Sequence, residues 1–205
     1  VYSSHRAVAQ AAGEFLNERL FQPGDVDVGK TKRGKRRLPN TPFIRDLVQF
    51  FIESELHEHA AYLVDSLIES NSMMKDWECM TDLLLEEPGP QEEPLDNRQE
   101  TSLIEIMVCC IKQAATGEAP VGRGPTRRVS SLREMKQAGE DKQKLTEHFI
   151  VSLPPLLDKY AADPEKLANL LSIPQYFDLD LYTSGRQEGS LQSLLVKLKH
   201  IAQVH

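Results

Sequence analysis

The stretch LVQFFIESELHEHAAYLVDSLIESNSMMKDWECMTDLLL, residues Leu47–Leu85, decides the fold class. Apolar residues in and just before it recur at i, i+3, i+4 and i+7, the spacing of one helix face. They form three successive stripes: Ile44, Leu47, Val48 and Phe51; Leu56, Ala60, Leu63, Val64 and Leu67; Trp77, Met80, Leu83 and Leu84. Because the joints are short, we expect the first two helices to fold back on one another, each covering the other's apolar stripe. The stretch predicts an all-α solenoid of antiparallel helix pairs that works as a surface rather than as an enzyme.

The composition agrees with helices that keep one face in water. The 205 residues are 40% hydrophobic but only 6% aromatic, and the mean hydropathy is −0.41. No apolar run approaches the roughly 18 residues of a membrane span, and we find no secretory signal. We therefore expect no membrane contact.

The three cysteines are expected to be structural. Cys79, Cys109 and Cys110 form no CxxC pair. Cys109 and Cys110 are adjacent in an apolar helix, where cysteine behaves as a small buried hydrophobe. We favour this interpretation over a disulfide or a metal site, and we expect a reducing compartment.

Turn-forming residues divide the chain into helices of HEAT-type size, about 40 residues a pair. The expected helices run from a cap at Ser3 or Ser4 to Leu20, from Thr41 through two or three helices to Glu86, from Asn97 to Ala115, over Lys144–Tyr160, from Asp163 to a break at Pro174, and from near Ser184 to the end. Thr41 is expected to cap its helix, and Pro154 and Pro155 to kink or end theirs or to open a new one. The expected loops are 21–40 (basic and flexible), 86–96 (acidic) and 116–130 (basic). We expect 1–205 to be one continuous segment cut from a longer superhelix.

His57-Glu58-His59 is the one cluster that suggests metal chemistry. A zinc protease helix needs His-Glu-x-x-His, which places both histidines on one face. Here His57 and His59 point about 200° apart on a helix, so we favour a solvated or hydrogen-bonding role. No phosphate loop or nucleophile motif is present in the sequence. We therefore predict no catalytic, cofactor or metal site and no small-molecule substrate.

Two basic segments are candidate nucleic-acid contacts. KTKRGKRR, residues 30–37, holds six positive charges in a chain of net charge −7. Cations on loops bind phosphates without reading bases. The candidate DNA contacts in this segment are Lys32, Arg33, Lys35, Arg36 and Arg37. The same run is typical of a nuclear import signal or of a solvated charge run, and from the residues alone we favour these two over DNA contact.

The second basic segment gives Arg123, Arg127 and Arg128 as candidate DNA contacts. Here DNA contact and solvation are equally favoured. Arg127-Arg128-Val129-Ser130 also fits a basophilic kinase site, so Ser130 is a candidate phosphorylation site. Trp77, in contrast, is expected to anchor the core rather than to stack on a ligand.

Long stretches of the chain closely resemble the stromalin (stromal antigen) family. They are VYSSHRAVAQAAGEFL at the start, Glu53–Leu67, Lys75–Pro88, PVGRG (Pro120–Gly124), Lys144–Tyr160 and IPQYFDLDLYTSGR (Ile173–Arg186). The family is the HEAT-repeat subunit of cohesin. Ile68 stands where vertebrate members carry Trp, and we interpret the chain as the middle portion of an invertebrate member.

The resemblance implies a non-catalytic scaffold of the cohesin complex. It implies binding to the kleisin subunit, to double-stranded DNA and to cohesin loader and regulatory proteins. It also implies a place on chromosomes in the nucleus, in sister chromatid cohesion and chromosome segregation. The alternative is a general HEAT-repeat adaptor whose basic loop is only an import signal.

Overall fold

The computed structural model describes residues 1–22, 28–54, 60–123, 131–180 and 188–204. This part contains eight α-helices and two short 3-10 helices, and its β-type pairing is limited to two isolated bridges. The helices are α1 (Arg6–Leu20), α2 (Thr41–Ser54), α3 (Ala61–Leu67), η1 (Ser72–Lys75), α4 (Trp77–Leu85), α5 (Asn97–Thr116), α6 (Leu132–Lys159), α7 (Pro164–Leu171), η2 (Ile173–Tyr176) and α8 (Glu188–Val204). The all-α prediction is confirmed.

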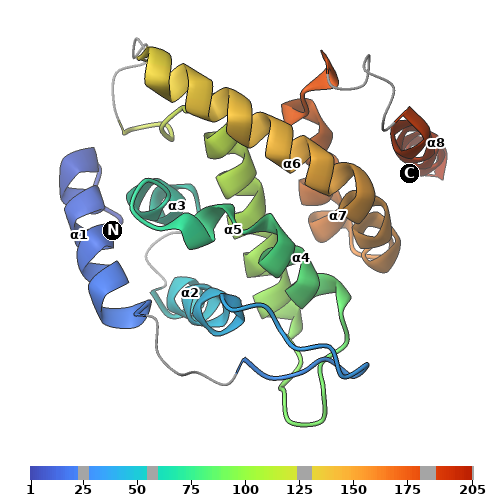
Figure 1. Ribbon diagram of the computed structural model, residues 1–205, viewed down its shortest axis with the longest axis horizontal. Helices are drawn as coiled ribbons and strands as arrows, with labels where there is room; N and C mark the ends of the chain where they lie inside the picture. Colours follow the sequence, from blue (N-terminus) through green and yellow to red (C-terminus); the bar gives the residue numbers. More distant parts are fainter. Residues whose placement is uncertain (23–27, 55–59, 124–130, 181–187, 205) are drawn as a thin grey trace.

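Helix α5 is the centre of the molecule, and α2, α3, α4, α6 and α7 all pack on it (Figure 1). Both ends of α5 are encoded in the sequence. Asp96 and Gln99 form a reciprocal capping box at the start, and Gly117, at φ +66°, ends the helix in the left-handed conformation. More than one face of the helix is buried, as its central position requires.

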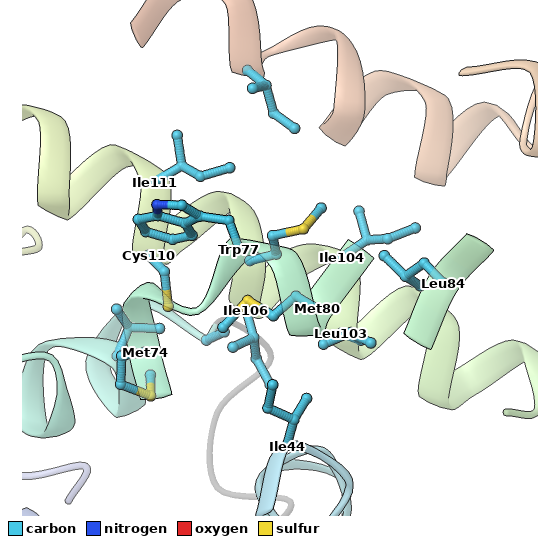
Figure 2. Close-up of a cluster of buried hydrophobic side chains, with 14 of the residues drawn as sticks. Ile44, Met74, Trp77, Met80, Leu84, Leu103, Ile104, Ile106, Cys110 and Ile111 are labelled. Carbon is cyan, nitrogen blue, oxygen red and sulfur yellow. The ribbon is translucent and has the colours of Figure 1, made fainter. Parts of the chain in front are cut away.

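Part of the hydrophobic core lies between α4 and α5. Figure 2 shows Trp77, Met80 and Leu84 of α4 beside Ile104 and Ile111 of α5. Trp77 is 6% exposed, and its ring lies 6.4 Å from that of Phe149 on α6. Truncating a buried Trp typically costs about 3–5 kcal/mol. The prediction that Trp77 anchors the core is confirmed.

The partners of α2 and α3 differ from the expected hairpin. Helix α3 packs chiefly on α1, and α2 packs on α5 and α4. The helices α1 and α3 approach closely at Gly13, which has no side chain. A Cβ added there would lie 2.0 Å from the carbonyl oxygen of Ser66. Helix α3 is buried over five consecutive residues, Leu63 to Leu67. This run covers more than one helical turn, so the helix is buried on all sides there. A pattern of single stripes does not predict this.

Two expected helix caps are wrong. Thr41 is the first residue of α2 rather than the cap before it, and its hydroxyl lies 3.4 Å from Cys79 Sγ. Helix α1 is preceded by His5, whose side chain makes no capping hydrogen bond. Ser3 Oγ instead accepts a hydrogen bond from the His5 N–H.

Helix α6 is longer than expected and continues through Pro154 and Pro155. It begins with a capping box between Ser131 and Glu134 that the sequence analysis missed. The helix end or new helix start expected at the prolines is wrong, and a kink there stays a prediction. Leu153, Leu156 and Leu157 are fully buried around them, and we infer that this packing outweighs the lost hydrogen bond of a proline.

The helix starts and ends expected in the last part of the chain agree with the structure where it is described. Asp163 caps α7, and Pro174 falls in η2. The buried ammonium of Lys166 pairs with Asp163 and with the side-chain oxygen of Asn97. The expected helix start near Ser184 lies outside the described residues. No helix in the described ranges is long and apolar enough to span a membrane.

Candidate nucleic-acid interface

Residues 30–37, called here the basic hairpin, fold into a tight turn. Thr31 N donates to Lys35 O at 2.8 Å, and Gly34 N donates to Thr31 O at 2.8 Å. Gly34, at φ +80°, supplies the left-handed residue of the turn. An isolated bridge joins Thr31 to Pro88 and places the hairpin against the acidic loop. The described part of this loop is therefore hydrogen-bonded both within itself and to the acidic loop.

Arg37 fixes the hairpin from inside the protein. Its side chain is 1% exposed and donates to Asp82 Oδ2 at 2.8 Å, Glu92 Oε2 at 2.9 Å and the carbonyl oxygens of Asp82 and Glu86. Burial acts to lower the pKa of Arg37, but the hydrogen bonds to Asp82 and Glu92 outweigh it and hold the pKa above its usual value. Because this guanidinium is enclosed and makes four hydrogen bonds inside the protein, Arg37 is corrected from a DNA contact to a structural residue.

Two cations of the hairpin are exposed but paired. Lys32 Nζ lies 2.5 Å from Glu87 Oε2, and Lys35 Nζ lies 2.8 Å from Asp82 Oδ1. The hydrogen bond with Lys32 lowers the pKa of Glu87, and the hydrogen bond with Asp82 raises the pKa of Lys35. The Lys32–Glu87 pair is exposed on both sides and such pairs are weak, so a phosphate can replace Glu87. Lys35 is bound to a buried carboxylate instead.

Arg33 and Arg36 are the displayed cations of the hairpin, together with Lys30. All three are exposed, and none forms a salt bridge with a carboxylate of the described residues. Lys32, Arg33, Lys35 and Arg36 thus remain as candidates. They lie on one hydrogen-bonded turn that contacts the acidic loop.

Arg123 lies in the interior and is corrected from a DNA contact to a structural residue. Its side chain is fully buried and donates to Ser3 O at 2.9 Å, to Tyr62 O at 2.6 Å and to Val1 O. It also pairs with Asp65 at 3.3 Å. Its guanidinium lies 4.2 Å from the centre of the Tyr62 ring. These contacts join three segments far apart in the sequence.

Asp65 is the hub of this interior network. It is fully buried on α3 and also accepts hydrogen bonds from Arg6 of α1, at 3.0 Å, and from Gln113 of α5, at 2.7 Å. A buried carboxylate requires such partners. The sequence signal was available, because Asp65 interrupts an apolar run on a helix, as Asp82 does on α4.

The other residues that the sequence analysis named as candidates lie outside the described residues. They are Arg127, Arg128, Ser130 and both histidines of the His57-Glu58-His59 cluster. Within the described ranges, no three His, Cys, Asp or Glu residues are grouped as a metal site would need. Burial raises the pKa of the Cys79 and Cys109 thiols to about 12, so these two are unreactive.

The fold and this surface define a class: a helical repeat scaffold that displays charged loops. A family model described as "Cohesin subunit SCC3/SA, HEAT-repeats domain" matches residues 62–205. The chain is 57% identical over 208 residues to "Cohesin subunit SA-1" of Xenopus laevis, 42% over 207 residues to "Cohesin subunit scc-3" of Caenorhabditis elegans, and 44% over 208 residues to human "Cohesin subunit SA-3". Each match covers 100% of this chain.

The chain belongs to the SCC3/SA (stromalin) family of cohesin subunits. It spans 16% to 18% of the length of these three relatives, so it corresponds to a segment of such a protein. The family consists of structural subunits, and this membership confirms the predictions of a HEAT-repeat solenoid and of a non-catalytic chain.

Proposed function

We propose that this chain is a scaffold segment of a cohesin subunit that supports sister chromatid cohesion and chromosome segregation in the nucleus. The family membership supports the proposal, because the matched relatives are named as cohesin subunits. We further propose that residues 1–205 form one continuous piece of the solenoid. That this piece is the middle portion of an invertebrate chain stays a prediction.

The proposed DNA contact is the basic hairpin, through Lys32, Arg33, Lys35 and Arg36. The observation that carries it is the Arg37 anchor, since it holds the turn in one shape while its neighbours stay in water. Preorganised cations contact phosphates without first losing backbone entropy. Such contacts are independent of sequence and depend strongly on salt.

The hairpin geometry disfavours the alternative in which this run is only an import signal. A linear import signal is bound as an exposed, extended peptide. Here the run turns back on itself at Gly34, and Arg37 is enclosed. Binding in the extended form would require breaking the contacts of Arg37 with Asp82 and Glu92.

A titration of duplex DNA with the full chain tests the DNA contact. The variant carries Lys32→Glu, Arg33→Glu and Arg36→Glu. We expect its affinity to fall about 10- to 100-fold and its slope of log K against log salt to fall by about 2–3. The matched control reverses three other exposed lysines and changes the net charge equally: Lys112, Lys136 and Lys199. Equal losses in both variants would leave only a net-charge effect and would contradict the proposal.

We also propose binding to the kleisin subunit and to cohesin loader and regulatory proteins. Large apolar side chains on the outer helices support a protein partner, since Val8 and Phe15 of α1 are 59% and 58% exposed. Crosslinking of the full chain to overlapping kleisin fragments, read by mass spectrometry, tests the kleisin contact. We expect crosslinks confined to one or two fragments. No crosslink with any fragment would count against kleisin binding by this segment.

A further inference from the structure

A cleft of about 1000 Å³ lies between the end of α5, the first turns of α6 and the segment that follows α3. We call it the α5–α6 cleft. In Figure 1 the start of α6 extends past the upper end of α5, above α3. Residues 132–140 of α6 are exposed except for the half-buried Ala138. This wall of the cleft is thus free on the side that faces away from the core.

Small residues make up part of the cleft wall, and the apolar, flexible side chain of Met135 lies beside them. Ala114 and Ala115 of α5 and Ala138 and Gly139 of α6 line it, and Met135, 61% exposed, stands at the wall. Small residues leave room for a bulky side chain of a partner, and methionine adapts its shape to what it contacts. The volume is at the upper end of the range of ligand pockets. This shape suits a short peptide better than a small metabolite.

The charges of the cleft are unequal once internal pairs are removed. Arg6 pairs with Glu69 at 2.9 Å, and Lys75 pairs with Asp141 at 2.5 Å. Glu134 is engaged in the capping box at the start of α6. Two further cations line the cleft, Arg133 and Lys142, and neither forms a salt bridge with a carboxylate of the described residues. The capping hydrogen bonds leave the Glu134 carboxylate charged, so the lining holds four cations and three carboxylates, a net charge of +1 that favours an acidic partner.

We propose that the α5–α6 cleft binds a short acidic peptide segment of a partner protein. One large apolar side chain of the peptide packs against Met135, Ala115 and Ala138, and its carboxylates pair with Arg133 and Lys142. Duplex DNA fits less well, because the cleft offers an apolar contact at Met135, Ala115 and Ala138 that a phosphate backbone does not use. The proposal stands apart from the DNA contact of the basic hairpin. Residues 124–130 form no part of it.

Fluorescence anisotropy with the full chain at low ionic strength tests this site. The probe is an array of short labelled peptides in which aspartates and glutamates surround one Phe or Leu, and a matched array carries lysines and arginines instead. We expect the acidic array to bind and the basic array not to. The variant Arg133→Glu with Lys142→Glu should weaken binding at least about tenfold. Lys136→Glu on the same helix should leave it unchanged, since Lys136 does not line the cleft.

A second variant separates the shape of the cleft from its charge. Gly139→Leu places a side chain in open space, because no atom lies within 4 Å of an added Cβ. Leu also favours the helix over Gly, so folding is preserved while the cleft is filled. We expect a loss of about tenfold or more in peptide binding. Unchanged binding in Gly139→Leu, no binding of the acidic array, or duplex DNA binding through Arg133 and Lys142 would each overturn the proposal.

Discussion

The basic hairpin and the loop 117–123 are each held by a buried Arg–Asp pair, but the two loops have different roles. In each, one arginine is buried against an aspartate of a short helix: Arg37 on Asp82 of α4, and Arg123 on Asp65 of α3. The hairpin then displays the cations beside its anchor, whereas the described part of the second loop displays no other cation. It joins α3 to the start of the chain instead.

The positive charge of its neighbours in sequence does not show whether an arginine is structural or exposed for binding. Both runs read as basic, yet the acid that an arginine reaches on a buried helix decides whether it is structural. Asp65 and Asp82 lie among apolar residues on short helices, and each carboxylate needs a cation because burial without a partner is costly.

Removing the Arg123 anchor should have the largest effect. Arg123→Met leaves Asp65 with fewer partners and removes the hydrogen bonds that Arg123 donates to the carbonyl groups of Ser3 and Tyr62. We expect a loss of about 3–5 kcal/mol in the free energy of unfolding, measured by urea denaturation. Arg123→Lys keeps the positive charge and should therefore lose less of the free energy of unfolding than Arg123→Met. A loss below about 1 kcal/mol in Arg123→Met would mean that the network contributes little.

The glycines of the two loops should differ in the same direction. Gly122 and Gly34 have φ of +88° and +80°, so alanine at either position is strained by about 1–2 kcal/mol. A Cβ on Gly122 would in addition lie 2.4 Å from the Tyr62 hydroxyl, whereas a Cβ on Gly34 meets nothing within 4 Å. Urea denaturation should therefore show a larger loss for Gly122→Ala than for Gly34→Ala. The reverse order would contradict the close contact between Gly122 and the Tyr62 side chain.

Releasing a paired cation of the hairpin should strengthen DNA binding slightly. Glu87→Gln frees Lys32 from its salt bridge, and we expect affinity for duplex DNA to rise about 2- to 5-fold at low salt. Glu93→Gln, on the same loop, is the control, since the Glu93 side chain forms no salt bridge with a described residue. An equal rise in both variants would show a general charge effect instead of release of Lys32.

The smallest expected effect is a shift in one titration. Lys32 lowers the pKa of Glu87 from its usual value of 4.5. Because the folded pKa is depressed, the contact is present above the unfolded pKa and is lost as pH falls through the folded pKa. Carboxylate NMR should give a midpoint below 4.5 for Glu87, and Lys32→Gln should raise it toward that value. An unmoved midpoint in the variant would remove the Lys32–Glu87 pair from the account.

The sequence predicted the helices better than their partners. The spacing of Ile44, Leu47 and Val48 predicts the helix found there, and the helix expected from Asn97 to Ala115 differs from α5 by one residue. The packing of α3 on α1 was not predicted, because it depends on how closely Gly13 approaches Ser66 in space. Helical continuity through Pro154 likewise depends on packing around α6, which no local pattern contains.

The candidate site was predicted in part, for a related reason. The basic run at 30–37 was visible as a cluster of charge, and four of its five candidate residues remain exposed. The burial of Arg37 and Arg123 depends on Asp82 and Asp65, which lie 45 and 58 residues away in the sequence. Local composition carries no information on such long-range pairs.

The most direct test compares two adjacent arginines of the hairpin. Urea denaturation of Arg36→Gln and Arg37→Gln makes the same chemical change at a displayed and at an anchoring position. We predict that Arg36→Gln stays within about 0.5 kcal/mol of the unchanged chain. We predict that Arg37→Gln loses about 2–4 kcal/mol, because Asp82 and Glu92 each lose their buried cationic partner and keep only Lys35 and Arg45. Equal stabilities of the two variants would contradict the division of the basic run into an anchor and displayed cations.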